Sequence, residues 1–393
     1  GQPVHGHHQH ADRADLVRAQ EQIATGRRIL KPSDDPVASS QALGVKQAQA
    51  RTAQFAENVG NAQNDLGLTE SMLAQVTSLL QSVRDQAVAA GNPSYDDANR
   101  ASLAVDLRGR LEELLGLANA TDGDGRHLFA GFRDQTPPFS STASGVVYDG
   151  DAGRRELDVA GGRSMPVREN GASLFMSVRN GNGTFNATAA PANTGTAVIG
   201  ALSNVGPTDA DTYEIRFVVS GGVTTYDVGN ATTSATVATG NAYTPGNAIA
   251  VAGRQVTITG TPADTDVVSL APSGTQSIFD TIAALAQALS TPVTDATSRA
   301  ELSNALNAGL QNVDRALEHV LTSRADVGAR LRELDALASG HEDTGLRQTA
   351  ELARLQDLDY AAAVSDFTRQ QVALEASQRT YAQMSRLSLF DYL

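Results

Sequence analysis

The sequence contains no cysteine and no tryptophan, and aromatic residues make up only 5% of its 393 positions. Without cysteine, the chain cannot form disulfides, use a thiolate in catalysis or build a cysteine-based zinc site. Because large rings are scarce, alanine, valine and leucine must fill the core, and these residues suit slender helical seams better than a thick globular core. We therefore expect stability to come from packing or assembly, and we predict no cofactor.

Positive charge is also scarce, since 30 basic residues stand against 44 acidic ones and the net charge is −14. A chain with this negative charge repels polyanions, so nucleic acid and anionic membrane surfaces are poor partners. No apolar run approaches the roughly 18 residues needed to cross a bilayer. Residues 1–10 lack the basic and apolar regions of a cleavable secretory signal, so we expect any export to use another route.

The strongest periodic pattern covers residues 37–90 and predicts one long helix. Alternating steps of three and four residues meet an almost entirely apolar row, which is typical of a coiled-coil-like seam. At 1.5 Å per residue the helix would be roughly 80 Å long. Ser33 or Asp34 can cap its start, and Pro36 fits its first turn. The row comprises Val45, Ala48, Thr52, Phe55, Val59, Ala62, Leu66, Thr69, Leu73, Val76, Leu80, Val83 and Ala87.

Four further helices are predicted from rows of leucine and valine. The first ends at the turn 121–125, and the other three cover residues 277–289, 295–338 and about 344–389. The row of the last helix is weakened by three polar residues, Asp357, Gln371 and Gln378.

The middle of the chain, residues 131–275, is rich in Gly, Thr, Val, Ala and Asn and predicts β structure. Residues 213–228 indicate a hairpin that turns at Gly221 and Gly222. Residues 146–159 and residues 249–259 indicate two more hairpins.

Helices at both ends and strands in the middle indicate an α+β fold. We expect an elongated antiparallel helical bundle, built from both chain ends, with an inserted small β domain. The predicted parts are terminal helical assembly segments at 1–44 and 347–393, a helical rod with a β-hairpin at 45–184 and 276–346, and the β domain at 185–275.

Several motifs, taken in order, resemble flagellin-like proteins. The N-terminal signature of that family is similar to residues 22–29 and 31–36, and residues 126–131 resemble the stretch that ends its first helical pair. The C-terminal segments of the family are similar to residues 326–331 and 357–361.

The last six residues, 388–393, resemble the close of the hook-associated protein 3 family, the junction subunits beside the flagellar filament. Together the resemblance covers roughly residues 14–180 and 275–393. Residues 1–13 do not look like the family, whose members begin with Met and an apolar-patterned helix. Here the segment has almost no apolar side chain and contains Pro3 and two glycines, which lower helix propensity.

The resemblance implies a structural subunit of the bacterial flagellum and not an enzyme. Such a subunit would be exported unfolded through the flagellar type III apparatus, without a cleaved signal peptide. It would then assemble outside the cell as a short tubular layer that joins the hook to the filament. Its partners would be copies of itself, the other junction protein, flagellin and an export chaperone.

Apolar residues on the terminal and rod helices are expected to serve helix packing or assembly. A chain end cannot bury much surface alone, so the C-terminal apolar residues are expected to contact a subunit or a chaperone. The predicted residues are Leu16, Ile23, Leu30, Phe55, Leu66, Leu73, Leu80, Tyr360, Phe367, Leu374, Tyr381, Leu387, Leu389, Phe390 and Tyr392.

Two clusters suggest metal binding, and each also has a simpler interpretation. Imidazoles bind Zn²⁺, Ni²⁺ and Cu²⁺, but the four histidines of residues 5–10 also fit a tail with incidental metal affinity, which we favour. Asp122 and Asp124 match part of a Ca²⁺ loop but lack the later ligands of an EF-hand. They therefore indicate a turn that ends a helix, and we predict no metal site.

Two carboxylate pairs, Asp34 with Asp35 and Asp357 with Asp359, could in principle serve acid–base chemistry. No partner nucleophile accompanies them, and the first pair lies where helix caps are favoured by the helix dipole. We therefore predict no catalytic residue.

The basic residues Arg27, Arg28 and Lys31 fit either a solvated face or a pairing with acidic groups on a neighbouring subunit.

The alternative function is a secreted adhesive or carbohydrate-binding protein with the helices as a stalk. Sugar sites usually need stacking rings, and the β insert is poor in them. A coiled-coil chaperone would leave the β insert unexplained. The composition therefore favours the structural subunit.

Overall fold

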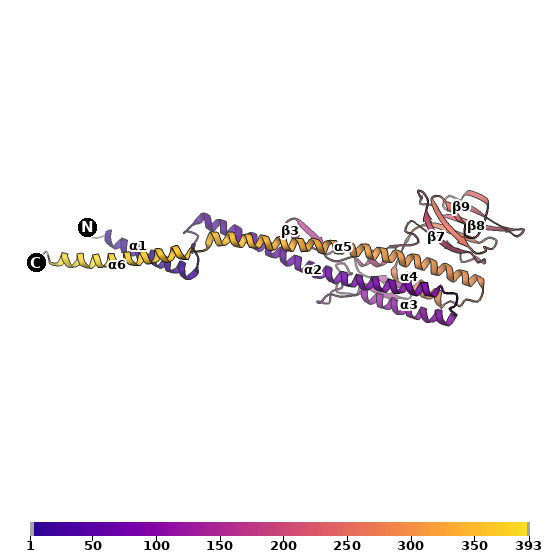
Figure 1. The fold of residues 1–393 in the computed structure, drawn as a ribbon, viewed down its shortest axis with the longest axis horizontal. Helices are drawn as coiled ribbons and strands as arrows, with labels where there is room; N and C mark the ends of the chain where they lie inside the picture. The colour runs from indigo at the N-terminus through magenta and orange to yellow at the C-terminus, as the bar shows by residue number, and fades with distance from the viewer. Residues whose placement is uncertain (1–3, 391–393) are drawn as a thin grey trace. The chain divides into compact units, whose positions relative to one another are not determined.

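The computed structural model describes residues 4–390, with side chains over residues 13–380 and 382–383. The chain forms two compact units. Unit 1 contains the residues up to 60, residues 159–162 and the residues from 335 onward, and unit 2 contains residues 61–158 and 163–334. Helices come from both ends of the chain and antiparallel strands from its middle, so the predicted α+β class is confirmed (Figure 1).

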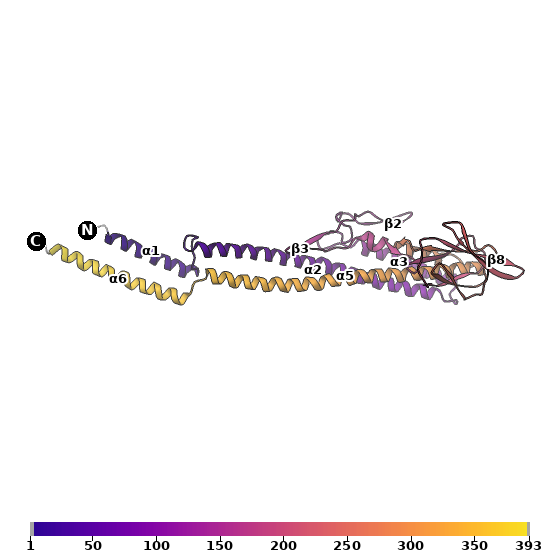
Figure 2. The same ribbon diagram turned by 90° about the horizontal axis from the view of Figure 1, so that it is seen from above.

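Unit 1 is helical and consists of segments from the two chain ends. Its elements are α1 (Val4–Thr25), the start of α2 (Pro36–Ala90), the end of α5 (Ala296–Gln356) and α6 (Tyr360–Phe390). Both views show α1 running beside α6 (Figures 1 and 2).

Side chains also join α2 to α5 within unit 1. The amide nitrogen of Gln49 donates to the hydroxyl of Thr349 at 2.9 Å, and the Phe55 ring stacks on His341 with 5.9 Å between ring centres. The His341 Nε2 atom lies 2.7 Å from the carbonyl oxygen of Val159.

Unit 2 contains the rest of α2 and α5 together with α3 (Asp97–Ala118) and α4 (Ile278–Ser290). The predicted long helix and its apolar row are confirmed here, because every row position from Ala62 to Ala87 is buried. Ion pairs join α2 to α5 within the unit, from Arg84 to Asp314 at 2.7 Å and from Arg324 to Glu70 at 2.6 Å.

Side-chain caps mark where the shorter helices of unit 2 begin. The carboxylate of Asp96 caps α3 by accepting from the backbone N–H of Asn99, and the hydroxyl of Ser277 caps α4 by accepting from that of Asp280. The helix α4 packs on α3 and also approaches α5 at Gly309. A Cβ at Gly309 would overlap the side chain of Leu285, so only glycine permits this approach.

The predicted division of the C-terminal helices is wrong. We expected helices at 295–338 and 344–389, but α5 continues to Gln356 and the break falls at residues 357–359. A glycine such as Gly340 costs a helix only about 1 kcal/mol, and the contacts of His341 lie directly after it. The low helix propensity of residues 1–13 does not prevent a helix in the described backbone, since α1 begins at Val4.

Two short hairpins follow α3. The first pairs β1 (Phe139–Thr142) with β2 (Gly145–Tyr148), and the second pairs β3 (Glu156–Ala160) with β4 (Arg163–Pro166). The predicted single hairpin over residues 146–159 is therefore wrong. The segment around Asp151 is a loop, because its carboxylate accepts N–H groups from the turn at Phe132 and from Gly153.

The β domain contains two larger antiparallel sheets, of strand order β10-β9-β8-β13-β6 and β11-β12-β7. Their shared core includes the fully buried rings of Phe185 and Phe217. Two smaller elements accompany these sheets, namely the two-stranded sheet β14-β5 and a π-helix, η1 (Ala172–Met176). The bounds are β5 (Val178–Arg179), β6 (Phe185–Ala189), β7 (Val198–Asn204), β8 (Tyr213–Ser220), β9 (Val223–Asn230), β10 (Ala235–Ala242), β11 (Ala248–Val251), β12 (Arg254–Thr259), β13 (Val267–Pro272) and β14 (Thr275–Gln276).

Two of the predicted hairpins are confirmed. Strands β8 and β9 pair in register around Gly221 and Gly222, whose φ angles of 60° and 80° suit a two-residue turn. Strands β11 and β12 pair around Gly253, which also has a positive φ.

Candidate assembly site

The terminal helices of unit 1 both break at one joint, which is closed by backbone hydrogen bonds. The N–H of Leu358 donates to the carbonyl of Gly26 at 3.0 Å, and the N–H of Arg28 donates to that of Gln356 at 2.8 Å. Between them, Arg27 and Asp357 form an antiparallel β-bridge. The end of α1 and the start of α6 are thus tied together although they lie about 330 residues apart in sequence.

Glycine is required at the centre of this joint. Gly26 has a φ of 69°, a left-handed conformation that other residues adopt at a cost. A Cβ there would also lie 2.8 Å from the hydroxyl oxygen of Tyr360. The tyrosine at the first position of α6 therefore lies against this glycine and would have to shift to admit a Cβ.

Arg28 connects three parts of the joint. Its guanidinium donates to the carbonyl of Leu355 at 3.0 Å and pairs with the carboxylate of Asp35 at 3.2 Å. The side-chain amide of Gln22 donates to the backbone carbonyl of Arg28 at 2.5 Å. Arg28 therefore pairs with an acidic group of its own chain, which neither interpretation of the basic cluster included.

The carboxylates predicted as caps organise the turn before α2. Asp35, rather than Ser33 or Asp34, caps α2 by accepting from the N–H of Ala38 at 3.0 Å. That N–H, and then the neighbouring Arg28, hold the pKa of Asp35 below its ordinary value although burial opposes them. Asp34 instead accepts from the N–H of Lys31, which likewise lowers its pKa.

The second carboxylate pair marks the break between α5 and α6. Asp359 caps α6 by accepting from the N–H of Ala362 at 3.1 Å. The N–H of Asp357 donates back to Ala353 and so closes the last turn of α5. Asp359 therefore has a structural role at a helix end through its carboxylate, and Asp357 has one through its backbone N–H.

The seam between α1 and α6 differs from the predicted row. Its half-buried positions on α6 are Ala363, Phe367, Gln370, Leu374 and Ser377, spaced alternately by four and three residues. A pair of helices buries only one stripe of each, so apolar residues remain on the outer faces. The exposed ones are Val17, Tyr360, Val364 and Val372, with exposed fractions of 52%, 53%, 49% and 63%.

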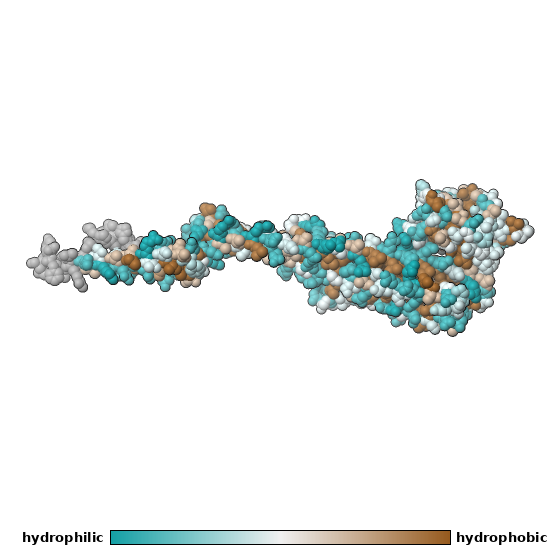
Figure 3. Space-filling model, in the orientation of Figure 1, coloured by the Kyte–Doolittle hydropathy of each residue, from teal (hydrophilic) through white to brown (hydrophobic). Residues whose placement is uncertain are grey.

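Along this helical pair, hydrophobic residues alternate with hydrophilic ones on the face drawn in Figure 3.

Comparisons with known proteins assign the chain to a family. Residues 8–134 match the bacterial flagellin N-terminal helical region, and residues 310–393 match the bacterial flagellin C-terminal helical region. The chain is 31% identical over 382 residues to flagellar hook-associated protein 3 of Escherichia coli K12, covering 96% of this chain and 93% of that protein. The same protein of Salmonella typhimurium matches to the same extent.

The chain belongs to the flagellar hook-associated protein 3 family.

Solved structures agree with this assignment. The flagellar junction protein FlgL of Legionella pneumophila is 30% identical with a TM-score of 0.73, covering 81% of this chain and all of that one. FlgL of Xanthomonas campestris is 32% identical with a TM-score of 0.73, covering 79% of this chain and 99% of that one. The chain is thus a structural flagellar protein related to subunits of the junction between hook and filament.

The family match begins at residue 8, which is earlier than the resemblance in the sequence suggested.

The other residues predicted for packing or assembly lie in several environments. Leu66, Leu73 and Leu80 are fully buried in unit 2, whereas Phe55 is half-buried in unit 1. Leu16, Ile23, Leu30, Phe367 and Leu374 are also half-buried. Outside the described side chains lie Tyr381, Leu387, Leu389, Phe390 and Tyr392.

A buried charge cluster in unit 2 was not predicted. The side chain of Arg168 is only 4% exposed and contacts the carboxylates of Asp122, Asp65 and Asp134 at 2.5, 3.6 and 3.7 Å. Asp122 also accepts from the N–H of Arg126, so it belongs to a helix-ending turn as expected. A lone arginine after a strand gives no sequence signal of such a cluster.

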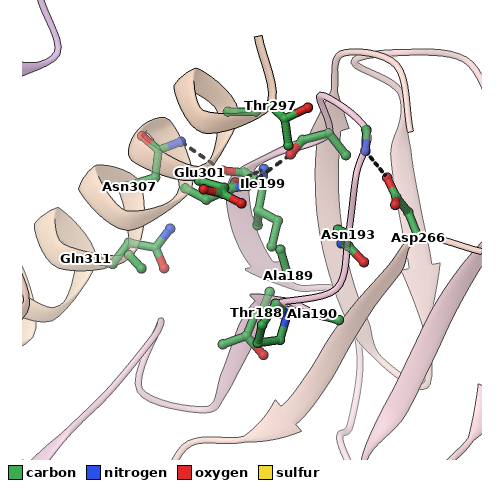
Figure 4. Close-up of a pocket in the computed structure, with 17 residues that line it drawn as sticks. Thr188, Ala189, Ala190, Asn193, Ile199, Asp266, Thr297, Glu301, Asn307 and Gln311 are labelled. Carbon is green, nitrogen blue, oxygen red and sulfur yellow. Dashed lines mark hydrogen bonds between the residues drawn. The ribbon is translucent and has the colours of Figure 1, made fainter. Parts of the chain in front are cut away.

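A cavity of about 390 Å³ lies in unit 2 between α5 and the strands β6 and β7 (Figure 4). Glu301, Asn307 and Gln311 on α5 line it opposite the strand residues. The amide of Asn304 bonds both the N–H of Ile199 and the carbonyl of Ala197, which fastens β7 to α5. No aromatic ring lines this cavity, so it gives no support to the carbohydrate-binding alternative.

Two negative findings hold for the described residues. They contain no group of three or more His, Asp or Glu side chains placed to hold a metal ion; the histidine side chains of residues 5–10 lie outside them. Within the same part of the chain, no helix combines the length and hydropathy needed to cross a bilayer.

Proposed function

We propose that this chain joins the hook to the filament as one subunit of a short tubular layer, with its terminal helices facing the inside of the tube. The support is family membership over almost the whole chain together with apolar residues left exposed on the terminal helices. A free subunit gains nothing from such residues, whereas neighbouring subunits can cover them.

The joint at Gly26 gives unit 1 a defined shape for this role. Its backbone hydrogen bonds fix where α1 ends and α6 begins, so the exposed positions on both helices keep a constant register. In an assembly, that register decides which residues of one subunit meet those of the next.

The route to this location is part of the same proposal. The subunit leaves the cell unfolded through the flagellar type III apparatus, without a cleaved signal peptide, and an export chaperone covers its C-terminal apolar residues beforehand. Outside the cell it contacts copies of itself, the other junction protein and flagellin. The chain has no catalytic activity in this role.

Val372→Glu tests the role of the outer face of α6, and Val223→Glu is a matched control. The two valines have nearly equal exposed fractions, 63% and 62%, but Val223 lies at the β8–β9 turn. In a strain that lacks its junction subunit, the Val372 variant should fail to retain filaments while the control restores motility. Both proteins should give the same circular dichroism spectrum. Full motility with both variants would refute the assembly role of this face.

A further inference from the structure

One wall of the cavity between α5 and the strands β6 and β7 is an open sheet edge (Figure 4). β6 is an edge strand of the five-stranded sheet and pairs with β13. Residues 187–189 of this strand line the cavity. An edge strand carries backbone N–H and C=O groups with which another chain can pair.

The pairing with β13 decides which backbone groups of β6 face the cavity. The N–H of Ala190 donates to the carbonyl of Val267 at 3.0 Å. Because the backbone groups of successive residues point to opposite sides of a strand, those of Ala187 and Ala189 point away from β13 and toward the cavity. Within the part of the chain that the structure describes, these outward groups have no hydrogen-bond partner.

The neighbouring strand edges, in contrast, are closed by side-chain amides. The amide of Asn193 donates to the carbonyl of Val267 and accepts from its N–H, both at 2.8 Å. On β7, the N–H of Ile199 donates to Asn304 at 2.7 Å, and the carbonyl of Ile199 accepts from Asn307 at 2.9 Å. The edge of β6 is therefore an open position in a wall that is otherwise satisfied.

The opposite wall of the cavity holds two polar side chains that are still available. Glu301 and Gln311 share a face of α5 with Asn304 and Asn307 and line the cavity (Figure 4). Neither Glu301 nor Gln311 forms a hydrogen bond or an ion pair with another described residue. A free carboxylate on a chain of net charge −14 favours a cationic ligand.

The rim of the cavity is held in place by one buried carboxylate. Asp266 accepts from the N–H groups of Thr194, Gly195 and Ala263 at 2.9, 3.0 and 2.8 Å. A Cβ at Gly195 would lie 2.3 Å from the backbone nitrogen of Ala263, so the two loops meet closely. A site that is already formed loses little conformational entropy when a ligand binds.

The floor of the cavity is small and apolar. Its buried residues are Ala187, Ala197, Ile199 and Ala300. Such a floor admits the small apolar side chains of a ligand.

We propose that this cavity binds an extended, cationic peptide segment of another protein. The segment adds a strand to β6, and its backbone exchanges hydrogen bonds with Ala187 and Ala189. These two alanines lie two positions apart, so about three successive residues of the segment meet both. Small side chains of the segment lie on the apolar floor, Gln311 contacts its backbone, and a positive charge approaches Glu301.

Titration of the full chain with a synthetic peptide tests the site. The probe is a short peptide of alternating alanine and valine that ends in lysine, with both termini blocked. The control peptide has the same side chains but N-methylated backbone nitrogens, so it cannot donate to a strand. Amide exchange followed by NMR should slow at Ala187 and Ala189 with the probe only. Exchange that the probe leaves unchanged, that both peptides slow equally, or that slows only elsewhere would overturn the proposal.

Three variants test the same site through the affinity of the probe. Ala189→Pro removes an outward N–H but no bond to β13, a change that edge strands tolerate, and it should abolish binding. Glu301→Gln should weaken binding about two- to fivefold, whereas Glu112→Gln, at an exposed position of α3, is the matched control and should leave it unchanged. Circular dichroism should show the same fold for all three.

Full binding by the Ala189 variant, or equal affinity of the two glutamate variants, would contradict the site. Both tests use the isolated chain, so their results do not depend on the proposed role at the junction.

Discussion

Leu73→Ala is the sharpest test of the packing described for α2. Leu73 is fully buried in unit 2 and lies on the apolar row that the sequence predicted. Replacing a buried leucine by alanine removes its transfer free energy and leaves a cavity, at a cost of roughly 2–5 kcal/mol. Leu68 lies five residues earlier on the same helix but is 39% exposed. We expect Leu68→Ala to change the free energy of unfolding by less than about 0.5 kcal/mol.

The assay is urea unfolding followed by circular dichroism at 222 nm, since the chain has no tryptophan to report by fluorescence. With a slope of about 1–3 kcal/mol per M, the midpoint of the affected transition should fall by about 1 M or more for Leu73→Ala. It should stay almost unchanged for Leu68→Ala. Equal midpoints for the two variants would refute the burial of this seam.

Three further predictions concern unit 1. Gly26→Ala should lower stability because of the positive φ and the nearby Tyr360 hydroxyl. Gly67→Ala, a control in open space on the part of α2 in unit 2, should raise stability by up to about 1 kcal/mol in thermal melts. The pKa of Asp35 is lowered in the folded state, so its contribution to the stability of the fold is present above about pH 4 and is lost as the pH falls through its folded pKa. Asp35→Asn should therefore flatten the pH dependence of the melting temperature. Limited proteolysis of dilute monomer should trim both ends towards residues 45 and 345, and full-length resistance would contradict the marginal stability expected of the terminal helices.

Most of the helical fold could be predicted because it rests on periodicity. The spacing of Leu66, Leu73 and Leu80 requires a helix that buries one side, and the structure buries all three. The β8–β9 hairpin could be predicted equally well, since a glycine pair such as Gly221 and Gly222 favours a two-residue turn.

The errors occurred where tertiary contacts outweigh local signals. We expected a break between residues 338 and 344, yet His341 in that stretch contacts Phe55 and Val159 and the helix continues. The true break at Asp357 depends on backbone bonds to residues near Gly26, and no local pattern reports a partner so distant in sequence.

The candidate assembly surface was only partly predictable for the same reason. Phe367 and Leu374 were placed on the helix seam, and they are half-buried there. The sequence could not tell that Val364 would be exposed, because the register of α6 against α1 is set by the joint.

Electron microscopy of flagella from a strain that lacks this gene tests the central claim most directly. The account predicts cells that carry hooks without filaments and shed filament protein into the medium, and it predicts that the intact gene restores attached filaments. Cells that keep normal filaments on their hooks without this protein would contradict its role at the junction.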